Sequence, residues 1–195
     1  MLENLRKSKI RRSNNICSIL QKIEANFNIF RLPGRLYDKL FYHKLMKAEL
    51  ALTKLDTEGK ILHIGTGPRP MTAIFLAEKG FYVDGLEIDG EARRKSQKLI
   101  KKEGLSSRIK IFSGNGEKVD YSKYDAIWLS LHVEPKRHIL NKILNEANKG
   151  TKVIYRNPAG WLAKIYQPVC PLELTGGQCK TTGIIKSKKS CLIEV

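Results

Sequence analysis

The stretch ILHIGTGPRPMTAIFLAEKG, residues 61–80, decides the fold. It begins as a short apolar run typical of a buried strand, turns on Gly65 and Gly67, and then reads as a helix that ends at Gly80. A strand that meets a helix through a glycine turn opens a unit in which strands and helices alternate. The turn also predicts a ligand site, because glycine lets the backbone approach a bound molecule closely.

The same alternation continues along the chain. Beyond residue 80 we expect strands at 81–88, 108–114, 124–131 and 151–157, helices at 90–103 and 135–150, a short helix near 161–166, and a closing hairpin of 183–187 with 190–195 around Lys188 and Lys189. Such alternation produces right-handed units and a mostly parallel sheet. We therefore predict an α/β fold, a Rossmann-like three-layer α/β/α sandwich whose mostly parallel seven-stranded sheet ends in a β-hairpin.

The first 56 residues have a different pattern from the rest. Apolar residues at roughly helical spacing occur over 16–30 and again from 35 to about 55, and Pro33 with Gly34 separates the two runs. We predict a short N-terminal helical cap over residues 1–56 and a Rossmann-like, ligand-binding domain over residues 57–195.

Bulk properties narrow the class of protein. The chain has 195 residues, of which 42% are hydrophobic, so it can bury the core of one domain. No apolar run approaches the roughly 20 residues of a membrane span, and the basic N-terminus lacks the apolar segment of a secretory signal. We therefore expect a soluble cytoplasmic protein that does not enter a membrane. Four cysteines without a CxxC pair or companion histidines predict free thiols and no metal site.

The formal charge of +17 favours acidic partners. A basic cluster at Arg6, Lys7, Lys9, Arg11 and Arg12 makes RNA a partner to consider. A lysine-rich, solvated surface explains the charge equally well. The sequence does not decide whether the chain forms a homodimer, so that state stays open.

Three ligands compete for the glycine turn. A nucleotide P-loop needs GxxxxGK[ST], and a dinucleotide site needs GxGxxG, but Pro70 occupies the position of the second glycine in the first motif and the third in the second. S-adenosylmethionine has no pyrophosphate and tolerates a bulkier third position, so we favour this cofactor. Two further residues fit it. Glu87, 20 residues after Gly67, suits the ribose hydroxyls, and Asn115 suits the adenine edge. The alternative for Glu87 is a negative charge that stabilises the N-terminus of the next helix, and the alternative for Asn115 is a plain Asn-Gly turn.

Residues 57–157 resemble the class I S-adenosylmethionine-dependent methyltransferases. The resemblance is carried by GTG after the first strand, GLEID at the second and YDAIWLSL at the fourth. Many members carry an acid two residues before the first glycine, where this chain has His63. The resemblance implies contacts from the loops that follow the strands. The residues expected to contact the cofactor are Gly65, Thr66, Gly67, Pro68, Glu87, Ile88, Asn115, Gly116 and Leu131.

A closer likeness is to nicotianamine synthases, which share this fold but transfer the aminocarboxypropyl arm of S-adenosylmethionine. GTGPRPMT, residues 65–72, is similar to their glycine turn, and RNPAGWLAKIYQP, residues 156–168, is similar to the segment after their fifth strand. They also carry a tyrosine and a glutamate seven residues apart, as Tyr42 and Glu49 are here. The likeness implies that Glu49 and Tyr42 orient or deprotonate the acceptor amine.

The expected chemistry follows from the cofactor. Its sulfonium carbon is already electrophilic, so the enzyme needs mainly to position a nucleophile, and a base only if that nucleophile begins protonated. His132 and Glu134, in the loop after the fourth strand, are candidate bases, with a structural role as the alternative for the histidine. Arg69 could meet a carboxylate of the cofactor or of an anionic acceptor. Trp161 and Tyr166 could line a substrate pocket, although core packing is the favoured explanation for them.

Three functions therefore remain open. The first is a transferase that uses S-adenosylmethionine on a small-molecule acceptor, with S-adenosylhomocysteine or methylthioadenosine as the product. The second is an RNA methyltransferase acting on tRNA or rRNA, which the positive charge motivates. The third is a non-catalytic module that binds S-adenosylmethionine, which the histidine at position 63 motivates.

Overall fold

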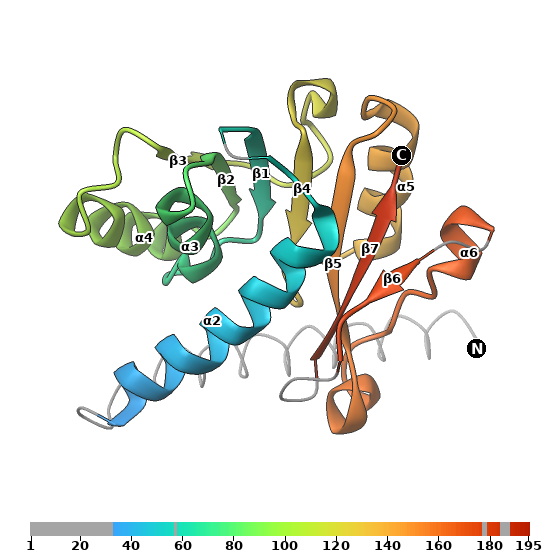
Figure 1. The fold of residues 1–195 in the computed structure, drawn as a ribbon, viewed down its shortest axis with the longest axis horizontal. Helices are drawn as coiled ribbons and strands as arrows, with labels where there is room; N and C mark the ends of the chain where they lie inside the picture. Colours follow the sequence, from blue (N-terminus) through green and yellow to red (C-terminus); the bar gives the residue numbers. More distant parts are fainter. Residues whose placement is uncertain (1–32, 57, 177–178, 184–187) are drawn as a thin grey trace, which may run out of the picture.

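The computed structural model describes residues 33–56, 58–176, 179–183 and 188–195 (Figure 1). The helix expected at 16–30 and the basic cluster between Arg6 and Arg12 lie outside the described residues. The elements in chain order are α2 (Pro33–Thr53), β1 (Lys60–Ile64), α3 (Met71–Glu78), β2 (Tyr82–Glu87), α4 (Gly90–Lys102), β3 (Ile109–Ser113), η2 (Tyr121–Lys123), β4 (Ala126–Leu129), α5 (Lys136–Glu146), β5 (Lys152–Pro158), η3 (Gly160–Lys164), α6 (Leu172–Thr175), β6 (Lys180–Thr181) and β7 (Lys188–Glu194).

The seven strands form one sheet in the order β3-β2-β1-β4-β5-β7-β6. The first five in this order pair in parallel, whereas β7 runs antiparallel to both β5 and β6. Strand β1 lies between β2 and β4, so the strand order reverses at β1. In an open sheet of this kind, ligands bind beyond the carboxyl ends of the strands at the point of reversal.

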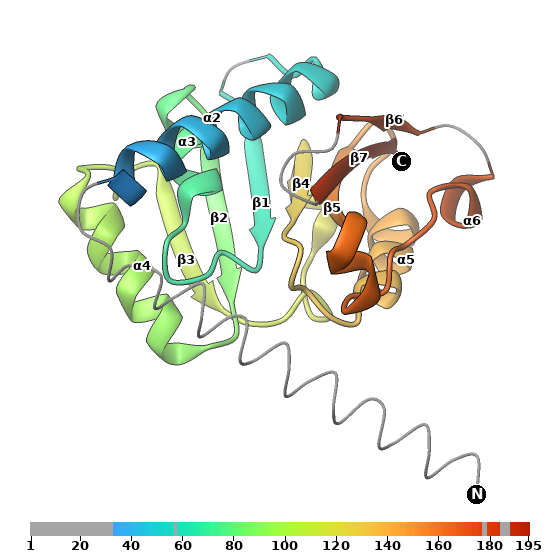
Figure 2. The same cartoon turned by 90° about the horizontal axis from the view of Figure 1, so that it is seen from below.

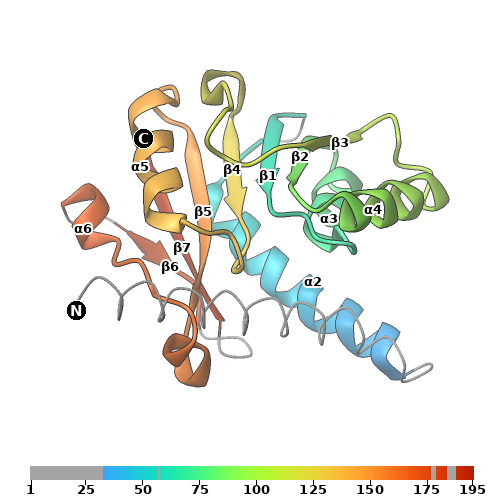
Figure 3. The ribbon, with the colours of Figure 1, turned by 180° about the vertical axis from the view of Figure 1, so that it is seen from behind.

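Helices cover both faces of the sheet, as Figures 2 and 3 show from two sides. One core joins α2, α3 and α4 to one face, through Met46, Phe75 and Ile100. The other core joins α5 to the opposite face, through residues such as Leu140 and Ile143. This arrangement confirms the predicted three-layer sandwich.

Local sequence explains where these elements begin and end. Strand β4 reads AIWL and is buried throughout, as expected of a central parallel strand. Helix α4 is amphipathic, and its N-cap Asp89 accepts a hydrogen bond from Ala92 N at 2.6 Å. Lys101 and Lys102 lie in its last turn, where the helix dipole favours positive charge.

A closing antiparallel hairpin is present, but residues 184–187 of the strand predicted to open it lie outside the described residues, and the predicted turn at Lys188 and Lys189 is wrong. Its strands are β6 and β7, with Thr181 opposite Cys191. Lys188 and Lys189, which were expected at the turn, lie in β7 and pair with Pro158 and Asn157 of β5. The long antiparallel pairing with β5 draws these lysines into the strand, because seven successive residue pairs outweigh the local turn propensity of two lysines.

Candidate functional site

The glycine turn lies at the carboxyl end of β1. Gly65 and Gly67 have φ values of +78° and +66°, in the left-handed region that favours glycine. A Cβ on Gly65 would lie 2.6 Å from Val133 Cγ2, whereas one on Gly67 would have no neighbour within 4 Å. Gly65 is therefore required for packing as well as for conformation, and the backbone at Gly67 borders open space. Pro68 follows in the turn and is half-buried.

Glu87 meets this turn from the end of β2. Its carboxylate accepts hydrogen bonds from Gly67 N at 2.6 Å and from Asp89 N at 3.0 Å. A carboxylate offers about four lone-pair sites, so two remain for a ligand. Asp89 takes the helix-capping role that was the alternative for Glu87. The neighbouring Ile88 is 72% exposed, so its apolar side chain is available to a bound molecule.

Thr66 adds a second sign of a ligand at the turn. Its side chain is buried, and its hydroxyl has no hydrogen-bond partner among the described residues. Buried hydroxyls are usually hydrogen-bonded, so an unpaired one calls for an explanation. The free lone pairs of Glu87, the open backbone at Gly67 and the unpaired Thr66 hydroxyl together fit a cofactor with a ribose.

Asn115 and Gly116 lie just beyond β3. The Asn115 side chain is engaged locally, since its Oδ1 accepts from Glu117 N at 3.3 Å and its Nδ2 donates to Glu117 Oε2 at 3.1 Å. Asn115 is exposed, and its contact with an adenine edge stays a prediction. Gly116 is buried, and a Cβ there would lie 2.9 Å from Ile139 Cγ2. Close packing against α5 therefore explains this glycine.

The loop after β4 carries Leu131 and His132. Leu131 is buried in a small cluster with Leu162 and Tyr166. His132 Nδ1 lies 2.7 Å from the hydroxyl of Tyr166, and the two rings meet edge to face with centroids 5.0 Å apart. Tyr166 is thus a core residue that also orients His132. Trp161, by contrast, is 57% exposed, so the core packing predicted for it is wrong.

A buried lysine holds this loop against β5. Lys136 is 1% exposed, and its Nζ donates to the carbonyl oxygens of Leu131 at 2.7 Å and of Arg156 at 3.0 Å. Burial lowers its pKa to about 8, although the nearby Glu134 carboxylate acts in the opposite direction. Lys136 therefore ties the end of β4 to β5.

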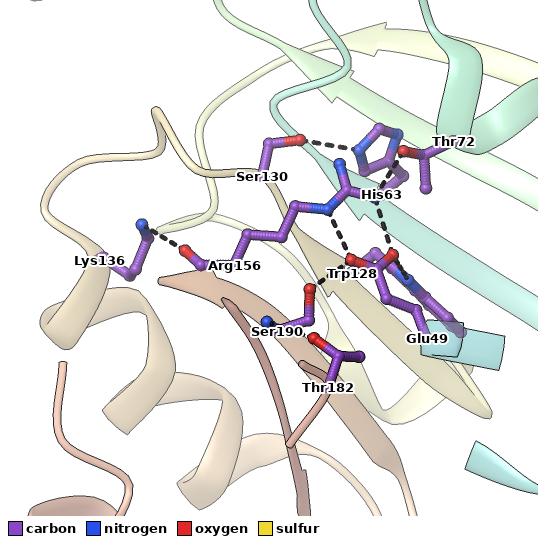
Figure 4. Close-up of polar contacts among 9 residues, drawn as sticks. All are labelled: Glu49, His63, Thr72, Trp128, Ser130, Lys136, Arg156, Thr182 and Ser190. Carbon is purple, nitrogen blue, oxygen red and sulfur yellow. Dashed lines mark hydrogen bonds and ion pairs between the residues drawn. The ribbon is translucent and has the colours of Figure 1, made fainter. Parts of the chain in front are cut away.

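A buried ion pair links α2 to the sheet (Figure 4). Both oxygens of Glu49 face the Arg156 guanidinium, at 2.7 Å from Nε and 2.8 Å from Nη2. Trp128 Nε1 and Ser190 Oγ also donate to this carboxylate, at 3.1 and 2.6 Å. Arg156 Nη2 donates in addition to Thr72 Oγ1 at 3.0 Å. The cluster joins α2, α3, β4, β5 and β7 at one point.

These contacts bear on the two upstream candidates, Glu49 and Tyr42. Glu49 is fully buried and accepts four hydrogen bonds, which favours a positioning role over proton transfer. Tyr42 is half-buried against the first core, and Lys188 Nζ lies 5.8 Å from the centroid of its ring. Their catalytic roles stay predictions.

His63, the residue that replaces the usual acid, is buried at the end of β1. Its Nε2 lies 3.0 Å from Ser130 Oγ, and its Nδ1 has no partner among the described residues. Burial, together with the positive charge of Arg156, lowers the pKa of His63 to about 3. The ring is therefore neutral at physiological pH.

Sequence reasoning overlooked Ser130, Thr72 and Lys136. Arg156 was noted only as part of a motif, although a charged residue within the buried strand KVIYRNP signals a buried partner. Lys136 lies in the first turn of α5, where positive charge is unfavourable to the helix dipole. A lysine at this unfavourable position indicates that its side chain has partners elsewhere in the structure. Ser130 and Thr72 gave no comparable signal.

Comparisons with known proteins agree with this geometry. The family model described as "Nicotianamine synthase protein" matches residues 35–185. L-histidine 2-aminobutanoyltransferase of Pseudomonas aeruginosa (strain UCBPP-PA14) is 28% identical over 135 residues, which are 68% of this chain and 51% of the relative. The chain thus spans about half the length of this curated relative.

Two solved structures show the same fold. A mutant of MtNAS in complex with S-adenosylmethionine has a TM-score of 0.74 at 24% identity, over 94% of this chain and 75% of the other. MtNAS in complex with MTA and tNA has a TM-score of 0.71 at 24% identity, over 97% and 73% of the two chains.

The described residues include neither a membrane-spanning helix nor a group of metal-binding side chains. None of the helices there combines the length and apolar character that a membrane crossing requires. In the same part of the chain, no three His, Cys, Asp or Glu side chains are grouped so as to hold a metal ion.

Proposed function

Because this chain belongs to the nicotianamine synthase family, we propose that it is a transferase that uses S-adenosylmethionine on a small-molecule acceptor. The observation that carries the proposal is the pairing of Glu87 with the glycine turn, 2.6 Å from Gly67 N, at the point where strand order reverses. This is where an open α/β sheet binds its ligand. The family match covers the whole of this turn.

The cofactor supplies an electrophilic carbon next to a sulfonium. The chain must then hold the adenosine and align an acceptor. Glu87 would accept from the ribose hydroxyls with its two remaining lone-pair sites, and the Asn115 amide would pair with the adenine edge. Thr66, Pro68, Ile88, Gly116 and Leu131 complete the cofactor site.

The acceptor is expected above the loop after β4. His132, oriented by Tyr166, is the candidate base there, and Tyr42 is the candidate on α2. We assign Glu49 to positioning, because its oxygens are already used by Arg156, Trp128 and Ser190. Positioning alone can supply several kcal/mol of a transfer barrier, so a weak base is sufficient.

The transferred group is proposed to be the aminocarboxypropyl arm, as the family name suggests, with methyl as the alternative. The name of the Pseudomonas aeruginosa relative, L-histidine 2-aminobutanoyltransferase, likewise describes transfer to a small molecule and favours such an acceptor over RNA. Aminocarboxypropyl transfer leaves methylthioadenosine, and methyl transfer leaves S-adenosylhomocysteine. Chromatography of the products after incubation with amino-acid acceptors separates the two.

The cofactor site is tested by isothermal titration with S-adenosylmethionine, S-adenosylhomocysteine and, as a control, NAD. We expect the first two to bind and NAD not to bind. Glu87→Gln should weaken both by about 10- to 100-fold, the range for a hydrogen bond to a charged group. Glu91→Gln, on the exposed surface of α4, is the matched control and should bind as the wild type does. Binding of NAD alone, or of no ligand, would overturn the proposal.

Other expectations from the sequence stay predictions. A cytoplasmic location is tested by cell fractionation, and a homodimer by light scattering. RNA binding is tested by filter binding across a range of salt concentrations. Separation of residues 1–56 from residues 57–195 is tested by expressing the second part alone.

A further inference from the structure

Three polar side chains form a row at the carboxyl edge of the sheet, on the face covered by α2 and α3. His63 lies on β1 opposite Trp128 of β4, and Ser130 follows β4 two residues later. Ser130 N donates to Ile64 O at 3.1 Å, which holds it beside β1. Arg156 occupies the corresponding place near the end of β5. Figure 4 shows the three side chains together, with the Arg156 guanidinium beside the contact between His63 and Ser130.

One nitrogen of the Arg156 guanidinium, Nη1, has no hydrogen-bond acceptor among the described residues. Its Nε and Nη2 donate to Glu49, and Nη2 also donates to Thr72. A guanidinium carries five N–H groups, of which the two on Nη1 have no acceptor among the described residues. In Figure 4 the guanidinium nitrogen without a dashed line points toward the side where His63 and Ser130 lie. The Glu49 carboxylate thus fixes the planar group with Nη1 presented toward Ser130.

The histidine and serine present a second donor at the same place. His63 is neutral, so its ring carries one N–H. When that proton is on Nε2, it is donated to Ser130 Oγ across the 3.0 Å contact, and the hydroxyl proton of Ser130 is left to donate elsewhere. Ser130 is only half-buried and can therefore reach a bound molecule.

We propose that Arg156 Nη1 and Ser130 Oγ form a carboxylate-binding subsite for the amino-acid end of a substrate, which is either the arm of the cofactor or an amino-acid acceptor. The subsite rests on the proposed function. Two donors side by side match the two oxygens of a carboxylate. Glu49 already neutralises Arg156, so the subsite recognises its ligand by hydrogen-bond geometry more than by charge. Lys136 fixes the backbone of the subsite, because its Nζ donates a hydrogen bond to the carbonyl oxygen of Arg156.

The experiment compares two ligands that differ by the amino-acid arm. S-adenosylhomocysteine and methylthioadenosine share the adenosine and the thioether, but only the first has the α-carboxylate. We expect Ser130→Ala to weaken S-adenosylhomocysteine by about 10-fold, the effect of one hydrogen bond to a charged group, and to leave methylthioadenosine within about twofold. Arg156→Lys keeps a positive charge for Glu49 but loses the planar guanidinium. It should therefore also reduce the ratio of the affinity for S-adenosylhomocysteine to the affinity for methylthioadenosine.

Ser107→Ala is the matched control, because Ser107 is exposed in the loop before β3. The thermal midpoint of each variant shows that it is folded. If the ratio of affinities is unchanged, binding of L-histidine and of L-glutamate in the presence of methylthioadenosine is titrated next. A loss of amino-acid binding in Ser130→Ala assigns the subsite to the acceptor.

The outcomes separate the two proposals. If Ser130→Ala affects neither the ratio nor amino-acid binding, the subsite is overturned while the proposed function stands. If the wild type binds neither S-adenosylhomocysteine nor methylthioadenosine, the proposed function itself fails.

Discussion

Replacing Glu49 by glutamine should destabilise the fold strongly. Glutamine has nearly the same shape, but it removes the charge opposite Arg156 and turns an amide donor toward groups that are themselves donors. Glu49 is fully buried and Arg156 is 6% exposed, so water does not replace the lost interaction. Breaking a buried ion pair by removing one partner costs about 3–5 kcal/mol. For a chain of this length each kcal/mol shifts the melting temperature by about 2–4 °C, so we expect a decrease of about 6–20 °C.

The structure also supplies the assay. Trp128 donates to Glu49 and is buried, so its fluorescence reports on the cluster during thermal or guanidinium unfolding. Glu91→Gln, which removes an exposed carboxylate paired with Lys95, should leave the midpoint unchanged. Replacing both partners, by Glu49→Leu with Arg156→Met, should recover part of the loss, because no uncompensated charge remains. A Glu49→Gln variant within about 0.5 kcal/mol of the wild type would refute this account of the ion pair.

Three more outcomes are expected. The pKa of His63 is about 3 in the folded state, below its unfolded value. The contribution of His63 to the free energy of unfolding is therefore complete above pH 6.5 and falls by about 1.4 kcal/mol per pH unit as the pH decreases toward 3. Denaturant titrations across this range should show a smaller dependence on pH in His63→Phe than in the wild type. Lys136 should lose its proton near pH 8, as measured by NMR of its side chain, and protonation that persists at pH 10 would contradict its burial. Gly65→Ala should lower the unfolding midpoint more than Gly67→Ala, because only the first combines a positive φ with a 2.6 Å contact to Val133; equal losses would mean that the loop yields freely.

The fold was predictable from the sequence because its signals are local. Each strand is a short apolar run, and glycines such as Gly80 and Gly104 adopt a positive φ where the helices before them end. The hairpin was placed wrongly because β6 is only two residues long, so its position depends on pairing with β7 and leaves little pattern in the sequence.

The candidate site was predictable only in part. The glycine turn follows β1 and Glu87 ends the neighbouring strand β2. Their separation of 20 residues is the length of one helix and one strand, so the sequence alone predicts that they lie close together. The contacts of Arg156 could not be found in this way, because Glu49 is 107 residues away in the sequence. Such contacts depend on the order of the strands in the sheet, which a pattern of apolar residues does not reveal.

The buried cluster has a consequence for the time course of synthesis. Glu49 and Ser190, which meet in it, are 141 residues apart. Ribosomes add about 5–20 residues per second, so roughly 7–28 s separate their appearance. Until Arg156 has been made, α2 can dock only with its carboxylate in water, because burial of that charge is unfavourable without its partner. Final packing of α2 onto the sheet is therefore a late event, which becomes favourable once β5 has been made and is completed by the Ser190 contact from β7.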